Sequence, residues 1–333
     1  MSQARPRRKQ YRTGLVSLIA SGLLLGFLYS RLDVRLIAQA LLRADRLWLA
    51  ISISIILPIT LLRAARFLWV APAGALTGIG EALRLTLVAS ALNLFAPAKA
   101  GDLIKGYAVA KRSATSPGVS LALVIYERLC DLFALIFWCV LGWTIGQPLS
   151  GRLDAPFWLL LGICGAGCAI LLLSDRAAET VRAIVTRVRP RGRLGALLAL
   201  AEGWPDLLHL LQRRRRWIVL LSLMLWLAHL FQLWMFTVAL STPVPFFVCA
   251  SLSALALMAG QIPFTLAGLG ARDVALVVLM LPYMAPESAA AMGILMATRG
   301  LVPALIGVPF TWPYVSSLLG DARPWRRRLE PVE

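Results

Sequence analysis

Residues 118–147 read GVSLALVIYERLCDLFALIFWCVLGWTIGQ, and nearly all of these side chains are apolar. A helix of about 20 apolar residues is long enough to cross the hydrocarbon layer of a membrane, which is roughly 30 Å thick. The stretch also contains Glu127, Arg128 and Asp131, and a charge at mid-bilayer costs about 2.5–3.5 kcal/mol on insertion scales. The segment therefore indicates a membrane-spanning helix with a polar site inside it.

The composition of the whole chain is typical of a membrane protein. Of its 333 residues, 59% are apolar and 15% are charged, and the mean hydropathy is +0.77. Soluble domains average about 45–50% apolar and about 25% charged residues. The composition therefore excludes a cytosolic enzyme with one buried core, a disordered chain and a disulfide-stapled secreted module.

The distribution of apolar residues predicts an all-α fold, a polytopic helical membrane bundle with about six full spans. The predicted spans are 13–30, 47–66, 118–147, 157–173, 217–240 and 289–316. No small-residue cleavage site follows the first of them, so we interpret it as a retained span and not as a signal peptide. Between the first two spans, 31–46 has the spacing of an amphipathic helix lying in the headgroup layer.

The basic residues predict the orientation of the bundle, because cytoplasmic loops carry an excess of Lys and Arg. They are concentrated in the tail 1–12, at Arg63 and Arg66 after the second span, in the loop 174–216 and in the tail 317–333. Placing all four groups in the cytoplasm puts both termini on the cytoplasmic side of the inner (plasma) membrane. We expect 174–216 to form short amphipathic helices on anionic lipid. No nucleic-acid recognition motif accompanies the net charge of +18, so the expected partner is membrane lipid and no nucleic acid.

Two further apolar segments, 82–98 and 246–267, are interrupted and then followed by charged residues. The interrupting residues are Pro97, Gly101, Pro263, Gly268 and Gly270. If both segments were simple crossings, the arginine-rich loop 174–216 would lie outside the cell. Re-entrant hairpins that enter from opposite sides, as in an inverted repeat, avoid this. The alternative is that each Pro/Gly cluster is a loop between ordinary helices.

The charges inside apolar segments are candidates for binding a lipid headgroup. Arg84 and Arg299 are isolated cations, and a planar guanidinium donates two parallel hydrogen bonds to a phosphate. The alternative is that they pair with Glu127, Asp131, Asp102 or Asp273. Glu127 and Asp131 are four residues apart and share a helix face. They either form internal ion pairs or line a polar cavity that meets a headgroup.

Four motifs resemble those of a known family. They are NLFAPAKAGDLIK at 93–105, ERLCD at 127–131, PFTLAGLGARD at 263–273, and Arg299. Their order and spacing resemble the lysylphosphatidylglycerol synthase transmembrane-region family, a flippase-like integral membrane family, over residues 13–316. The resemblance implies two re-entrant hairpins and transport of a lipid between leaflets. At Asp102 and Asp273 the family usually has glutamate, so a shifted substrate or geometry is implied.

The sequence favours a lipid flippase or translocase that moves a phospholipid or lipid-linked headgroup through a polar intramembrane cavity. The candidate substrate-binding residues are Arg299, Arg272, Glu127, Arg128, Asp131, Asp102, Asp273, Arg84 and Lys105. The synthases of the family continue into a soluble aminoacyl-transfer domain, whereas this sequence ends at Glu333. We therefore do not expect it to make lysyl lipid.

No ATP-binding phosphate loop and no catalytic constellation occur in the sequence, so we expect neither an enzyme nor a cofactor. Cys164 and Cys168 are four residues apart but have no His or carboxylate nearby, so we expect no metal site. Two alternative functions stay open. One is a membrane-embedded transferase with Glu127 as a buried base, and the other is a small-solute secondary transporter. A homo-oligomer and a lipid-modifying enzyme also stay open as partners.

Overall fold

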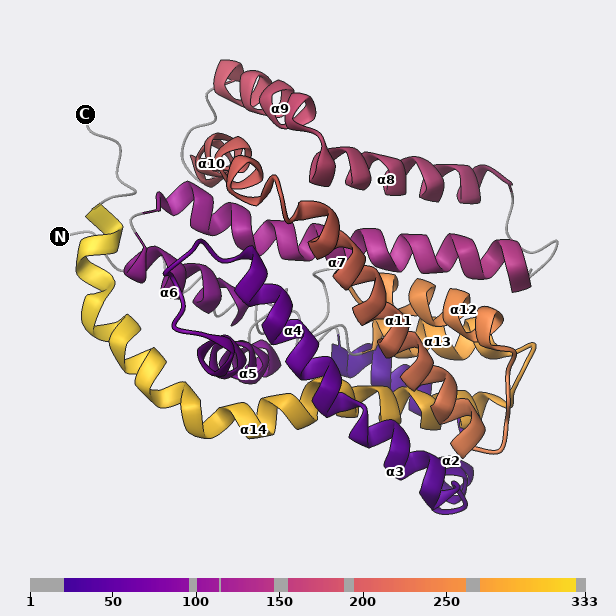
Figure 1. Ribbon diagram of the computed structural model, residues 1–333. Helices are drawn as coiled ribbons and strands as arrows, with labels where there is room; N and C mark the ends of the chain where they lie inside the picture. The colour runs from indigo at the N-terminus through magenta and orange to yellow at the C-terminus, as the bar shows by residue number, and fades with distance from the viewer. Residues whose placement is uncertain are drawn as a thin grey trace.

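The computed structural model describes residues 21–95, 101–113, 115–146, 155–188, 195–261 and 270–327, and these residues form helices without any strand (Figure 1). A helix at Ser21–Ser30 precedes the labelled ones. The labelled helices are α2 (Val34–Leu42), α3 (Arg46–Ser54), α4 (Ile56–Val70), α5 (Ile79–Phe95), α6 (Leu103–Arg112), α7 (Pro117–Gly146), α8 (Ala155–Leu173), α9 (Asp175–Val188), α10 (Gly195–Leu211), α11 (Arg215–Ala239), α12 (Phe246–Ala259), α13 (Ala271–Met280) and α14 (Pro286–Arg327).

Within these described ranges, five helical segments are long and apolar enough to cross a membrane. They are Arg46–Val70, which joins α3 and α4, Pro117–Gly146, Pro156–Leu173, Arg215–Ala239 and Pro286–Tyr314. They match five of the six predicted spans to within a few residues at each end. The sixth predicted span, 13–30, lies partly outside the described residues, and its last part is the helix Ser21–Ser30. The all-helical, polytopic membrane fold is confirmed.

The first interrupted segment forms a helix pair, α5 and α6, at the N-terminal end of α7 (Figure 1). Glu81 near the start of α5 pairs with Arg112 at the end of α6, so the pair enters and leaves on the same side. α6 packs along the first half of α7, where a Cβ atom on Gly106 would lie 2.9 Å from the carbonyl oxygen of Ser120. At the other end of α6, Asp102 pairs with Arg128, which lies closer to the middle of α7, so this hairpin extends into the bundle.

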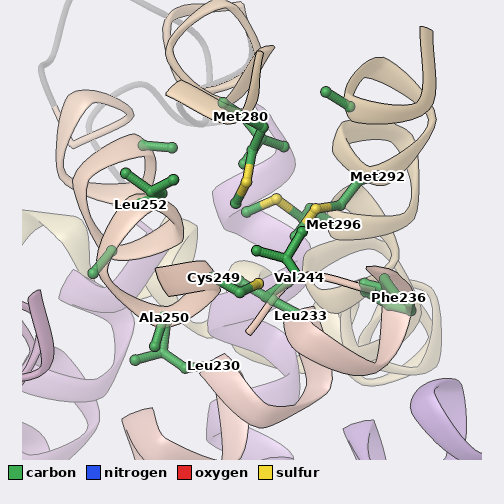
Figure 2. Close-up of a cluster of buried hydrophobic side chains, with 14 of the residues drawn as sticks. Leu230, Leu233, Phe236, Val244, Cys249, Ala250, Leu252, Met280, Met292 and Met296 are labelled. Carbon is green, nitrogen blue, oxygen red and sulfur yellow. The ribbon is translucent and has the colours of Figure 1, made fainter. Parts of the chain in front are cut away.

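The second interrupted segment, α12 and α13, forms a helix pair at the opposite end of α7 (Figure 1). α12 begins beside the C-terminal end of α7, where a Cβ atom on Gly142 would lie 2.6 Å from the Phe247 carbonyl oxygen. Figure 2 shows Met280, at the end of α13, close to Val244 and Cys249 from the region where α12 begins. The two broken hairpins thus enter from opposite ends of the bundle, as the predicted inverted repeat requires.

The second hairpin is held by the largest apolar cluster, to which α11, α12, α13 and α14 contribute. Figure 2 shows Leu230 and Leu233 of α11 beside Ala250 and Cys249 of α12, with the sulfur atoms of Met292 and Met296 of α14 between the helices. Phe236 of α11 belongs to the same cluster. Methionine fills irregular gaps because its unbranched side chain has three rotatable bonds. This packing fixes α13 and α14 next to each other.

The basic segment 174–216 contains α9 and α10, whose described side chains pack differently. On α9, Val181 and Ile184 are exposed. On α10, Trp204, Leu207 and Leu208 are buried in a cluster shared with α7, whereas Leu210 is exposed. One face of α10 therefore packs on the bundle, and its expected position on lipid stays a prediction. A bidentate contact joins Asp175 at the start of α9 to Arg215, with N–O distances of 2.7 and 2.8 Å. This contact lowers the pKa of Asp175 below its ordinary value.

The amphipathic helix predicted between the first two spans is α2. Asp33 caps it by accepting a hydrogen bond from the Arg35 backbone N–H at 2.8 Å, which satisfies one of the free donors of the first turn. Ile37 is buried on one side, whereas Val34 and Leu42 are exposed. The exposed apolar side is suited to the acyl boundary of a bilayer.

Candidate functional site

A cavity of about 410 Å³ lies at the middle of the bundle, between the two hairpins. Its walls come from the middles of the long helices α7, α11 and α14, from α4, and from the inner ends of α5, α12 and α13. The residues that line it are Arg63, Ser90, Asn93, Leu94, Arg128, Asp131, Leu225, Trp226, His229, Leu257, Gly260, Gln261, Arg272, Met296, Ala297, Arg299, Gly300 and Leu301. The volume is in the range of sites that hold small molecules.

The charged side chains of this cavity are mostly cationic. Arg63 of α4, Arg128 of α7, Arg272 of α13 and Arg299 of α14 line it, and Asp131 is the single carboxylate among the described lining residues. Each arginine comes from a different helix, so the four guanidinium groups converge only through tertiary packing. A concave site with this excess of guanidinium groups favours an anionic group.

Arg299 is held in place by α11 without a carboxylate. Its Nε atom donates to Nδ1 of His229 at 3.2 Å, and its guanidinium carbon lies 5.7 Å from the centre of the Trp226 ring. Because Nδ1 accepts this hydrogen bond, His229 is neutral with its proton on Nε2. The remaining donors of Arg299 stay available for a ligand in the cavity.

Next to the cavity, two buried cations and two buried carboxylates from α4, α6 and α7 form a chain of alternating charges. Arg66 lies 2.6 Å from Asp131 and 3.6 Å from Glu127, and Lys105 lies 3.2 Å from Glu127. Asp131 also accepts a hydrogen bond from the Trp226 indole N–H at 3.0 Å. The sequence left open whether Glu127 and Asp131 form internal ion pairs or line a cavity. Both form ion pairs, and Asp131 also lines the cavity.

A carboxylate closes the break of each hairpin. In the first, Asp102 pairs with Arg128 and accepts a hydrogen bond from the Asn93 side chain at 3.1 Å, which links α6 to the end of α5. Gly101 permits this approach, because a Cβ atom there would lie 2.7 Å from the Asn93 backbone nitrogen.

In the second hairpin, Asp273 accepts a hydrogen bond from the Gly270 backbone N–H at 3.0 Å and caps α13. Gly270 has a φ of +94°, which favours a residue without a side chain. Arg272 contacts Asp273 at 2.6 Å and donates to the Gly293 carbonyl of α14 at 3.2 Å. Both aspartates, Asp102 and Asp273, therefore belong to the hairpin geometry.

The structure brings four of the predicted substrate-binding residues to the cavity wall, namely Arg128, Asp131, Arg272 and Arg299. Four others, Asp102, Lys105, Glu127 and Asp273, form the ion pairs behind that wall. Arg84 lies on an exposed position of α5 and does not line the cavity. Pro97, Pro263 and Gly268 lie outside the described residues.

Sequence reasoning missed Arg63 and Arg66 as parts of the site. Their interpretation as cytoplasmic residues that close the second span is wrong, because α4 continues to Val70 and Arg66 is 3% exposed. The available signal was the apolar continuation Phe67-Leu-Trp-Val70 after the second arginine. It extends the span and moves both guanidinium groups inward.

Within the described residues, no three His, Cys, Asp or Glu side chains are close enough to share a metal ion. No curated protein and no solved structure matches the chain. The family described as the lysylphosphatidylglycerol synthase TM region matches residues 14–307, which is most of the chain and includes both hairpins and the cavity. The chain is therefore a member of the lysylphosphatidylglycerol synthase TM region family of integral membrane proteins.

Proposed function

We propose that this protein is a lipid translocase that moves an anionic phospholipid or lipid-linked headgroup between leaflets through the central cavity. The observation that carries the proposal is the convergence of four arginines on one cavity between two oppositely entering hairpins. Arginine binds phosphate oxygens through paired hydrogen bonds. Family membership supports a lipid-related role in the membrane.

The proposed mechanism replaces the water around the headgroup with guanidinium groups at mid-depth. A phosphate taken from water into a bilayer loses its hydration, and charge-assisted hydrogen bonds to the arginines offset that cost. Arg272 lies at the start of α13 in the second hairpin, and Arg128 pairs with Asp102 at the start of α6 in the first. Rocking of either hairpin then opens the cavity to one leaflet at a time, as broken helices do in transporters.

The acyl chains need not enter the cavity. At its rim on α14, Gly300 is exposed and Leu301 is 43% exposed, and Leu305 and Ile306 farther along the helix are also exposed. In a membrane this apolar surface faces lipid tails. We propose that the headgroup enters past the rim while its tails stay in the bilayer, so only the headgroup is desolvated.

The proposal places the protein in the inner membrane with the α9–α10 end in the cytoplasm. That end carries Arg176, Arg182 and Arg187 on α9 and the run at 213–216, which the positive-inside rule assigns to the cytoplasm. The hairpin of α5 and α6 then opens toward the cytoplasm, and that of α12 and α13 toward the opposite side.

This orientation predicts the accessibility of single cysteines placed in a chain without its five native ones. Arg176→Cys lies at the start of α9, and Ala285→Cys lies in the exposed turn before α14 at the other end of the bundle. In intact cells, a membrane-impermeant maleimide should label Ala285→Cys and should label Arg176→Cys only after permeabilisation. The reverse pattern would show the opposite orientation.

The transport proposal predicts that purified protein in liposomes accelerates the exchange of tail-labelled phospholipids between leaflets. Arg299→Gln should slow exchange by about ten-fold, the effect of losing one charge-assisted hydrogen bond. Arg299→Lys should give an intermediate rate, because lysine keeps the charge and loses the fork. Exchange is followed as the loss of fluorescence to an impermeant reductant.

Arg176→Gln is the matched control, since Arg176 is an exposed arginine far along the chain from the cavity-lining residues. Its exchange rate should equal that of the unaltered protein. Exchange rates that are the same with and without protein, for phosphatidylglycerol, phosphatidic acid and phosphatidylethanolamine alike, would reject the proposed function.

A further inference from the structure

The charges around the cavity do not balance, and the imbalance bears on which headgroup it takes. Six cations lie at the cavity or directly behind its wall, namely Arg63, Arg66, Lys105, Arg128, Arg272 and Arg299. Four carboxylates accompany them, namely Asp102, Glu127, Asp131 and Asp273. Arginine keeps its proton in proteins, and Lys105 and Glu127 lie 3.2 Å apart and cancel as a pair. The five arginines then exceed the three remaining carboxylates by two positive charges.

Each of the four carboxylates forms an ion pair with one or two of these cations. Asp131 pairs with Arg66, Glu127 lies between Arg66 and Lys105, and the two hairpin aspartates hold Arg128 and Arg272. This leaves Arg63 and Arg299 as the two cavity arginines that no carboxylate of the described ranges contacts.

No other part of the chain near the hairpin breaks supplies the missing negative charge. The sequences between the described parts of the hairpins, 96–100 and 262–269, contain no Asp or Glu. The first of them contains Lys99, a further cation. His229 does not carry a charge while it accepts the Arg299 hydrogen bond.

Uncompensated charge in the low-dielectric middle of a membrane is unfavourable and is normally paired. Arg63 projects into the cavity from α4, and Arg299 from α14. A ligand that neutralises both has to bring two negative charges into one space of about 410 Å³. One phosphodiester brings a single charge, whereas a phosphomonoester brings nearly two above its second pKa of about 6. A diphosphate that is esterified at both ends also brings two.

We propose that the transported headgroup is a dianion, a lipid phosphomonoester or diphosphate held by Arg63 and Arg299, and that singly charged, zwitterionic and aminoacylated headgroups are discriminated against. This inference rests on the proposed function and narrows its substrate class. A cationic aminoacyl headgroup would raise the uncompensated charge of the cavity instead of cancelling it.

The test compares tail-labelled lipids that differ only in the headgroup, in liposomes at pH 8. Phosphatidic acid is a dianion at this pH, because the second pKa of a phosphomonoester is about 6. Phosphatidylglycerol is a monoanion, phosphatidylcholine a zwitterion and lysylphosphatidylglycerol a net cation. We expect phosphatidic acid to exchange about ten-fold faster than phosphatidylglycerol, the effect of one further charge-assisted contact.

Two variants connect this preference to the named residues. Arg63→Gln and Arg299→Gln should each abolish most of the difference between phosphatidic acid and phosphatidylglycerol, whereas Arg176→Gln should leave it unchanged. Arg63→Lys keeps the positive charge and should retain part of the preference, which separates loss of charge from misfolding. An unchanged ratio in both glutamine variants would overturn the assignment of the two arginines.

A binding measurement distinguishes failure of the inference from failure of the proposed function. In detergent micelles, phosphatidic acid should raise the melting temperature of the protein more than phosphatidylglycerol does.

Faster exchange of phosphatidylglycerol or lysylphosphatidylglycerol would overturn the dianion inference and leave translocation standing. Stabilisation by phosphatidic acid without exchange of any lipid would overturn translocation and leave the dianion site standing. Stabilisation by soluble glycerol 3-phosphate at the same concentration would overturn the assignment to a lipid.

Discussion

Replacing Asp131 with leucine is expected to lower the free energy of unfolding by about 3–5 kcal/mol, the cost of breaking a buried ion pair by removing one partner. The substitution leaves the guanidinium of Arg66, which is 3% exposed, without the carboxylate that lies 2.6 Å from it. It also removes the acceptor of the Trp226 indole N–H. Unfolding by sodium dodecyl sulfate in mixed micelles measures the difference.

A double-mutant cycle separates the loss of the Arg66–Asp131 pair from any effect of the leucine itself. Arg66→Met combined with Asp131→Leu removes both charges, so the double variant should recover most of the stability lost in the single variant. Asp175→Asn is the matched control, because the exposed pair with Arg215 contributes under about 1 kcal/mol. If Asp131→Leu were as mild as Asp175→Asn, the buried network would not hold α4 to α7.

The fold was largely predictable because membrane spans depend on local composition. A window of apolar residues predicts a helix whatever it packs against, and so five spans were located to within a few residues. The hairpin breaks were equally local, since proline and glycine interrupt helices by their own chemistry. The burial of α10 against α7 was not predictable, because it depends on contacts such as Gly203 against Gly118, 85 residues earlier in the sequence.

The site was only partly predictable, because its pairings join residues that are far apart in the sequence. An arginine inside a long apolar run, such as Arg299, is costly to insert into a membrane and is usually kept for a function. Its position in the sequence alone identified it as a candidate. The sequence left the partners of Glu127 open, since Lys105 and Arg66 approach it only through the packing of α4 and α6 on α7. Arg63 was misplaced because a basic residue near the end of an apolar stretch is normally cytoplasmic.

Gly307→Ala is expected to loosen the contact between α14 and α5, two helices that approach each other closely beside the cavity. A Cβ atom at this position would lie 2.1 Å from the carbonyl oxygen of Leu87 and 2.5 Å from its carbonyl carbon. Both are backbone atoms of a helix, so no side-chain rotation relieves the overlap and the helices must separate. Overpacking of this kind costs about 1–3 kcal/mol, and occasionally more.

The same displacement should reach the cavity, since Arg299 lies about two turns before Gly307 on α14 and Ser90 lies about one turn after Leu87 on α5. Gly307→Ala should therefore lower both the melting temperature in detergent and the rate of lipid exchange.

Gly162→Ala is the matched control, because nothing lies within 4 Å of the added Cβ atom and alanine is the better helix former by up to about 1 kcal/mol. The two substitutions should shift the melting temperature in opposite directions. Equal stability of the two variants would contradict the close approach of α5 and α14 and the place of Arg299 in the cavity wall.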